Sequence, residues 1–131
     1  MSLEYRKIKG VLTKDYTRFI SIKPNTKLVF RRISLDINGL LTILRYYVWD
    51  YASGALDTKS IIEGSLVHDG LCELMLNRRL PLSCWDEAAE VMKEVNLSKP
   101  YPMMRPRAWW VCRATKIAGP DVLTKRKIIT L

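Results

Sequence analysis

Hydrophobic residues in the first half of the chain are spaced as in β-strands. The segment from Tyr16 to Ile22 is rich in aromatic and β-branched residues, which favour strands. Residues 27–35 alternate in part between two faces and are read as one strand. Asn38-Gly39 is a strong signal for a two-residue hairpin loop, and it leads into a β-rich run from Leu40 to Trp49. The pattern predicts four mostly antiparallel strands before residue 50.

The second half of the chain has the pattern of three helices. A first helix is predicted to start at Asp57 or Thr58, either of which is a good N-cap, and to end near residue 77. A second helix is predicted over residues 83–95, with a Ser-x-x-Asp variant of the capping box at its start. A third helix is predicted over residues 106–118, between a proline that suits a first turn and a Gly-Pro stop.

These elements predict an α+β fold: an N-terminal antiparallel β-sheet followed by three helices and a basic C-terminal tail. The 131 residues are 48% apolar, which fits one domain with a sizeable core. Residues 1–120 are expected to form a single α+β domain, and residues 121–131 the tail. No apolar run is long enough to cross a membrane, and the N-terminus does not read as a secretory signal peptide.

Cysteine and histidine usage excludes some kinds of site. The three cysteines have no CxxC spacing, which argues against a disulfide framework and against a cysteine-rich zinc site. A single histidine is too few for a histidine-based zinc site. A reducing compartment is the simplest expectation.

The net charge of +9 is unevenly distributed. Residues 57–98 are net acidic, whereas the segments before and after them are strongly basic. Two basic arms favour a polyanion or an acidic protein surface as partner, and nucleic-acid binding is one such alternative. The simpler alternative is that the charge serves solubility alone.

The single histidine, His68, is followed by Asp69 and falls on the apolar face of the first predicted helix. A carboxylate partner would make a buried imidazole a better general base. Glu90 lies at the matching level of an antiparallel second helix, although its helical-wheel position points away from the core face. Asp50 and Asp57 are further candidates. The alternative is a core histidine without a catalytic role.

The loop before the first helix carries carboxylates beside a glycine, a combination that suits calcium. No EF-hand spacing is present, and an ordinary turn and cap is the simpler interpretation. We therefore expect no cofactor, with calcium on Asp69 and Asp50 as the alternative. The loop residues of interest are Trp49, Asp50, Ser53, Gly54 and Asp57.

Three short motifs together resemble a small uncharacterised family of bacteriophage and prophage proteins. They are Trp49-Asp50-x-Ala52-Ser53-Gly54, Asp57-Thr58-Lys59 and Ser65-Leu66-Val67-His68-Asp69. Weaker similarity extends the resemblance to roughly residues 40–119. The chain departs from the family at three positions, where it has Tyr51 for glycine, Cys72 for tyrosine and Glu90 for aspartate. The resemblance implies a viral origin, an α+β domain, and a location in the host cytoplasm or the virion.

A looser similarity leads to a hydrolase alternative. His-Asp-x-x-Tyr on a helix is similar to the motif of secreted-type and parvoviral phospholipases. In those enzymes the histidine activates water, while the aspartate and an upstream glycine-rich loop hold calcium. The analogy implies a calcium-dependent hydrolase with His68 as base and Asp69 or Glu90 in support. The tyrosine of that motif is Cys72 here.

The third predicted helix is both basic and aromatic. One face carries Arg105, Trp109, Arg113 and Lys116, while Trp110 and Ile117 lie on the other side. Tryptophan among arginines is typical of protein interfaces and also suits nucleic acid. Alternatively, Trp109 packs beneath the sheet and the arginines are solvated. Further basic residues follow in the tail: Lys125, Arg126 and Lys127.

The leading functional interpretation is a phage-encoded structural or accessory protein, a virion component that docks onto other phage proteins. Its docking residues would be those of the basic aromatic helix and the tail. A homo-oligomer is a further alternative for the partner. The two competing interpretations are the hydrolase and a nucleic-acid-binding accessory protein.

Overall fold

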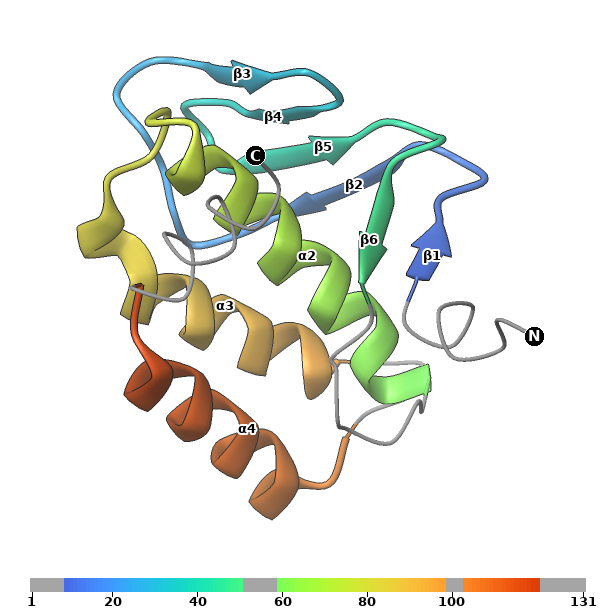
Figure 1. Cartoon of the computed structure of the whole chain (residues 1–131), viewed down its shortest axis with the longest axis vertical. Helices are drawn as coiled ribbons and strands as arrows, with labels where there is room; N and C mark the ends of the chain where they lie inside the picture. Colours follow the sequence, from blue (N-terminus) through green and yellow to red (C-terminus); the bar gives the residue numbers. More distant parts are fainter. Residues whose placement is uncertain (1–8, 51–58, 99–102, 121–131) are drawn as a thin grey trace.

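The computed structural model describes residues 9–50, 59–98 and 103–120. Antiparallel strands come first and three α-helices follow (Figure 1), so the predicted α+β class is confirmed. The strands are β1 (Lys9–Val11), β2 (Tyr16–Phe19), β3 (Leu28–Phe30), β4 (Ile33–Leu35), β5 (Leu40–Ile43) and β6 (Val48–Asp50). The helices are α2 (Lys59–Leu76), a short 3₁₀ turn η1 (Leu82–Cys84), α3 (Trp85–Asn96) and α4 (Arg105–Ala118). None of the described helices is long and apolar enough to span a bilayer.

The strands form two sheets. Four of them pair antiparallel in the order β2-β5-β4-β3, and β1 pairs antiparallel with β6. The β4–β5 connection is the hairpin that Asn38-Gly39 predicted, with a loop of residues 37–39 rather than two residues. The Asp36 carboxylate accepts hydrogen bonds from the backbone N–H groups of Asn38 and Leu40, both at 2.9 Å. Gly39 has φ +86°, a conformation that favours glycine.

Two predicted strands are each interrupted by a turn, so six strands replace the four expected. Residues 27–35 form the β3–β4 hairpin, in which Phe30 pairs with Ile33 and Arg31-Arg32 makes the turn. The run from residue 40 to 49 breaks after β5, and β6 leaves the larger sheet to pair with β1. Arg31 (φ +52°) and Tyr46 (φ +74°) occupy left-handed conformations at these turns. Neither residue type signals such a turn, which is why the sequence pattern missed both.

The main core lies between the four-stranded sheet and α2. Alternate residues of β4 and β5 point inward and meet the apolar side of α2, as the strand periodicity requires. The fully buried side chains there are Leu35, Leu41, Ile43, Val67, Leu71 and Leu74. Tyr16 and Arg18 of β2 also reach α2, where both donate hydrogen bonds to the carboxylate of Glu63, at 2.6 and 3.0 Å.

The three helices follow the sheet in succession, so that α4 is the outermost element (Figure 1). The start of α3 differs from expectation, because Cys84 is its N-cap and no side chain caps it. The predicted Ser83 capping box is therefore wrong, since Ser83 lies within η1. In α4 the predicted signals are confirmed: Pro106 lies in the first turn, and Gly119 ends the helix with φ +72°.

α2 and α3 approach most closely at Gly64. A Cβ on Gly64 would lie 1.9 Å from Oδ1 of Asn96, so only glycine fits there without movement. Asn96 is fully buried, and its side-chain amide has no hydrogen-bond partner within the described part of the chain. Burial of the Asn96 amide costs desolvation free energy, and this cost accompanies the close contact between α2 and α3.

We predict that Gly64→Ala lowers the free energy of unfolding by about 1–3 kcal/mol, because the added methyl group overpacks the α2–α3 contact. The loss should shrink by at least about 1 kcal/mol in an Asn96→Ala background, where the obstructing amide is gone. Urea unfolding of the four variants of this double-mutant cycle measures both values. Equal losses in the two backgrounds would show that Asn96 does not set the closeness of the helices.

Candidate functional site

His68 lies in the middle of α2 and packs against the start of α3. Its ring meets Trp85 edge-on, with centroids 5.5 Å apart and planes at 75°. The Cys72 thiol, one turn along α2, lies 3.6 Å from Nδ1 of His68. The Trp85 indole N–H donates in turn to the backbone carbonyl of Thr115 in α4, at 2.9 Å. His68 therefore belongs to a packed cluster at the junction of the three helices.

Asp69 and Ser65 hold the strand region against α2. The hydroxyl of Tyr47, in the turn before β6, donates to Oδ2 of Asp69 at 2.7 Å. One turn of α2 earlier, Ser65 Oγ accepts a hydrogen bond from the Trp49 indole N–H at 3.2 Å. Asp69, Ser65 and Trp49 are all buried. Two residues of the sequence-derived candidate set, Trp49 and Asp69, are thus brought to one contact zone between α2 and β6.

Glu90 lies at the α3–α4 contact, and its carboxylate bonds to groups of those two helices. Oε2 accepts a hydrogen bond from Nζ of Lys116 and one from the Cys112 thiol at 3.6 Å, while Oε1 is 2.9 Å from Nζ of Lys93. Hydrogen bonds from Lys116 and Lys93 lower the pKa of Glu90 to about 2. Burial, aided by the nearby Glu90 charge, raises the pKa of the Cys112 thiol. His68 is not among the partners of Glu90, consistent with the helical-wheel position that points Glu90 away from α2.

The described residues do not form a recognisable cation site. Within the described residues, no group of three or more His, Cys, Asp or Glu side chains is placed to hold a metal ion. The Asp69 carboxylate is engaged by Tyr47 instead. Ser53, Gly54 and Asp57 lie outside the described residues, as does the side chain of Asp50. The calcium-dependent hydrolase stays a prediction, and no catalytic step follows from the described geometry.

The outer face of α4 is the most exposed apolar surface that the sequence analysis singled out. Ala108 and Cys112 are buried towards α3. On the opposite side, Trp110 is 68% exposed and Ile117 74%, while Trp109, on the flank nearer α3, is 59% exposed. The alternative that Trp109 packs beneath the sheet is wrong, because α4 packs on α3, away from the sheet (Figure 1).

Two hollows flank Arg113, whose guanidinium lies 5.8 Å from the centre of the Trp109 ring. On the α3 side, Trp109, Arg113 and Lys116 help to line a hollow of about 140 Å³ that also contains Glu90. On the other side is an apolar hollow of about 350 Å³, lined by Trp110, Arg113, Ala114, Ile117 and Ala118. Arg105 is exposed at the start of the same helix, while Lys125, Arg126 and Lys127 lie outside the described residues.

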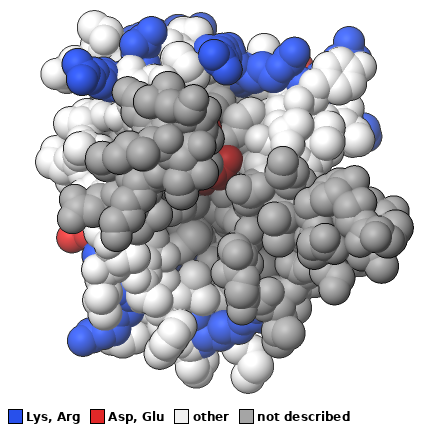
Figure 2. Space-filling model, viewed as in Figure 1, with Lys and Arg blue, Asp and Glu red and all other residues white. Residues whose placement is uncertain are grey.

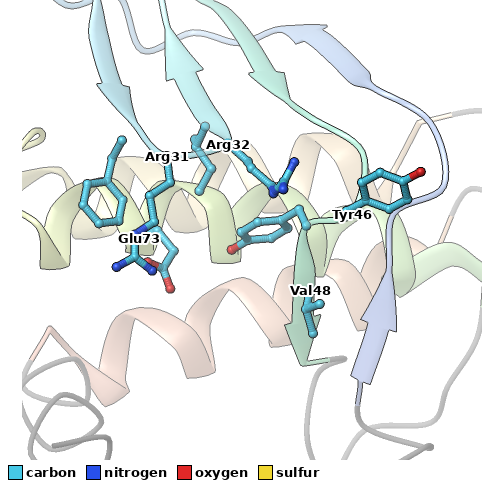
Figure 3. Close-up of a pocket in the computed structure, with 8 residues that line it drawn as sticks. Arg31, Arg32, Tyr46, Val48 and Glu73 are labelled. Carbon is cyan, nitrogen blue, oxygen red and sulfur yellow. The ribbon is translucent and has the colours of Figure 1, made fainter.

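Positive charge gathers at two ends of the face seen in Figure 2. Lys and Arg side chains lie over the strand hairpins at the top and over α4 at the bottom. Two arginines of the upper group line a hollow of about 260 Å³ at the β3–β4 turn (Figure 3). This hollow was not predicted from the sequence. Its arginines, Arg31 and Arg32, fall in the middle of a strand in the sequence-based prediction. The one sequence signal for this turn was that two adjacent arginines separate two short apolar runs.

Comparison of the chain with protein-family models, with curated proteins and with solved structures finds no match. The bacteriophage resemblance therefore rests on the quoted motifs alone. A functional assignment has to come from the geometry of the described residues.

We predict that Tyr47→Phe lowers the free energy of unfolding by about 1–3 kcal/mol, because it removes a hydroxyl donor from the buried Asp69 carboxylate. The neighbouring Tyr46→Phe is the matched control. The Tyr46 side chain is exposed, so its loss of a hydroxyl should change stability by less than about 0.5 kcal/mol. Chemical denaturation measures both variants, and equal effects would exclude an anchoring role for Asp69.

The lowered pKa of Glu90 predicts how stability depends on pH. A carboxyl group with a depressed folded-state pKa stabilises the fold above its unfolded pKa, here 4.5, and loses that effect as the pH falls towards 2. Glu90→Gln should therefore lower Tm above pH 5 and approach the wild-type Tm near pH 2. The side chain is 41% exposed, so solvent screening limits the difference to about 2 °C.

Glu94→Gln provides the control for this pH dependence, because Glu94 is exposed on the same helix. Thermal unfolding of the two variants and the wild type between pH 2 and pH 7 gives the comparison. A Tm difference for Glu90→Gln that does not change with pH would contradict the assigned ion pairs.

Proposed function

We propose that this chain is a binding module that docks an acidic, partly apolar segment of another protein on the outer face of α4. The observation that carries the proposal is the exposure of two neighbouring tryptophans on a helix whose inner side is already packed on α3. Monomeric proteins seldom leave contiguous apolar surface of this kind uncovered. Trp and Arg, which are both present on α4, are also residue types that dominate binding energy at interfaces.

The hollow beside Trp110 supplies the apolar part of the docking surface. Trp110 and Ile117 form its walls, and two alanines leave space between them. A tryptophan side chain buries about 150–250 Å² when it is covered. Covering Trp110 and Ile117 together would therefore provide the desolvated centre that an interface requires, while Arg113 would lie at its border.

Charge selects the kind of partner. α4 carries four basic residues, Arg105, Arg107, Arg113 and Lys116, and no acidic residue. Lys116 is partly neutralised by Glu90, whereas Arg113 is exposed and lies over Trp109. The net charge of +9 opposes a second copy of the chain as occupant, and the basic tail has the same sign as α4. An acidic segment of a different protein fits best.

The resemblance to bacteriophage proteins supports a bacteriophage as the biological setting of this interaction. In that setting the partner is another phage protein, and the chain is a structural or accessory component of the virion. A surface built on one helix suits assembly, because the helix holds its side chains at a fixed spacing for the partner. The catalytic alternative gains no comparable support, since the described contacts of His68 are those of a packed side chain.

We predict that Trp110→Ala combined with Ile117→Ala weakens partner binding at least about 30-fold, the effect of removing an interface hot spot. A photo-crosslinking residue at position 114, in the hollow between them, captures the partner in cells that produce the phage. The partner segment is then purified and its Kd is measured by calorimetry with wild type and variant. The captured segment should carry a net negative charge.

Phe19→Ala combined with Val11→Ala is the matched control, since it removes similar exposed apolar area from the strands. This variant should keep the wild-type Kd. The proposal fails if both double variants bind equally well, or if the crosslink joins two copies of this chain. It also fails if position 114 captures no protein while a crosslinker at position 19 does.

A further inference from the structure

A third hollow lies at the β3–β4 turn (Figure 3). This turn is at the end of the molecule away from α4 (Figure 1). The volume of the hollow is about 260 Å³, below the range of drug-sized ligand pockets and suited to one small planar group. Arg31, Arg32 and Tyr46 line it from the two turns, and Glu73 lines it from α2.

Guanidinium groups lie over Phe30 and Tyr46, two of the aromatic residues that line this hollow, although Arg45 and Arg79 are not themselves part of the lining. Arg32 and Arg45 lie 5.8 and 5.1 Å from the centre of the Tyr46 ring. Arg31 and Arg79 lie 5.2 and 5.6 Å from the centre of the Phe30 ring. Cation–π contacts of this kind hold the flat guanidinium groups against the rings while their N–H groups remain able to donate hydrogen bonds.

The turns that carry these side chains are fixed by long-range hydrogen bonds. Arg31 and Tyr46 both have positive φ, which costs of order 1 kcal/mol or more for residues other than glycine. The Leu44 N–H donates to the Arg32 carbonyl at 2.9 Å, and the Tyr46 N–H donates to the Leu12 carbonyl at 2.6 Å. The Arg32 guanidinium donates to the Arg45 carbonyl at 3.0 Å, which ties one turn to the other.

We propose that this hollow binds single-stranded nucleic acid, with one base in the hollow against Tyr46 and the adjacent phosphates on Arg31, Arg32 and Arg45. Exposed aromatic rings between cationic groups are the combination that holds unpaired bases and their backbone. Tyr46 is 59% exposed and can present its ring to a base. The bases of a duplex are already stacked, so a duplex would use only the arginines.

Glu73 determines which part of a nucleic-acid strand would enter the hollow. Its carboxylate lines the hollow and disfavours a phosphate inside it. The arginines of the turn also line the hollow, but they are exposed, so phosphates on the solvent side can reach them. Phosphates are therefore expected along the rim and a base inside, which is the arrangement that separates a nucleic-acid strand from a uniformly acidic peptide.

We predict that Arg31→Ala combined with Arg32→Ala weakens binding of a 12-nucleotide oligothymidine at least about tenfold at 100 mM salt. The slope of log K against log salt concentration should fall by about 1.4, the value expected when two phosphates of a single strand are no longer neutralised by the protein. Fluorescence anisotropy measures both quantities. Replacing both arginines by lysine keeps the charge and should largely retain the slope.

Tyr46→Leu tests stacking separately from charge. It should weaken oligothymidine binding by about 5-fold to 100-fold without changing the salt slope. Lys23→Ala combined with Lys27→Ala is the charge-matched control, since both lysines are exposed and precede β3, at the far end from its turn. This control should bind within about twofold of wild type.

Three results would overturn the proposal. One is that the Arg31→Ala/Arg32→Ala variant and the Lys23→Ala/Lys27→Ala control weaken oligothymidine binding equally, which would mean that net charge alone attracts the DNA. Another is equal affinity for a duplex of the same length, which would exclude base stacking. The third is tighter binding of a 12-residue oligoglutamate than of oligothymidine through the same arginines, which would make the hollow an acidic-peptide site.

Discussion

The packing of α2 between the sheet and α3 is the constraint on which the rest of the structure depends. One side of the helix buries Val67, Leu71 and Leu74 against the sheet, and the other meets α3 through Gly64. The polar residues of α2 add specific hydrogen bonds to this apolar packing. Glu63 accepts hydrogen bonds from β2, while Ser65 and Asp69 hold β6 and the turn before it. The positions of both candidate binding surfaces follow from this helix.

The two proposed binding surfaces lie at opposite ends of the layered arrangement. α4 packs on α3 at one end, and the β3–β4 turn lies at the other end, in the sheet (Figure 1). The two tryptophans of α4 and the two arginines of the turn are exposed. Between them lie α2 and α3, which belong to the net acidic part of the sequence. If both proposals hold, this separation would let the protein contact a protein partner and a nucleic-acid strand at the same time.

Features set by local chemistry were predictable from the sequence. Asn38-Gly39 produced its hairpin and Pro106 and Gly119 bounded α4, because each acts through its own backbone preferences. The turn at Arg31-Arg32 was not predictable, since an arginine adopts positive φ there only with support from hydrogen bonds made by distant residues. The helical wheel placed Glu90 off the core face of its helix, although Glu90 was kept as a candidate partner of His68. The partner of Glu90, Lys116, became known only once α4 was in place.

The shallow attachment of α4 has a consequence for local stability. The helix buries Ala108 and Cys112 fully, and its remaining links to α3 include the Trp85–Thr115 hydrogen bond and the Glu90–Lys116 ion pair. Such an element opens at a lower free energy than the α2–sheet core, so its amide hydrogens exchange with solvent first. A partner that covers the tryptophans would close this sub-global opening. Partner binding and stabilisation of the packed state of α4 would then be thermodynamically coupled.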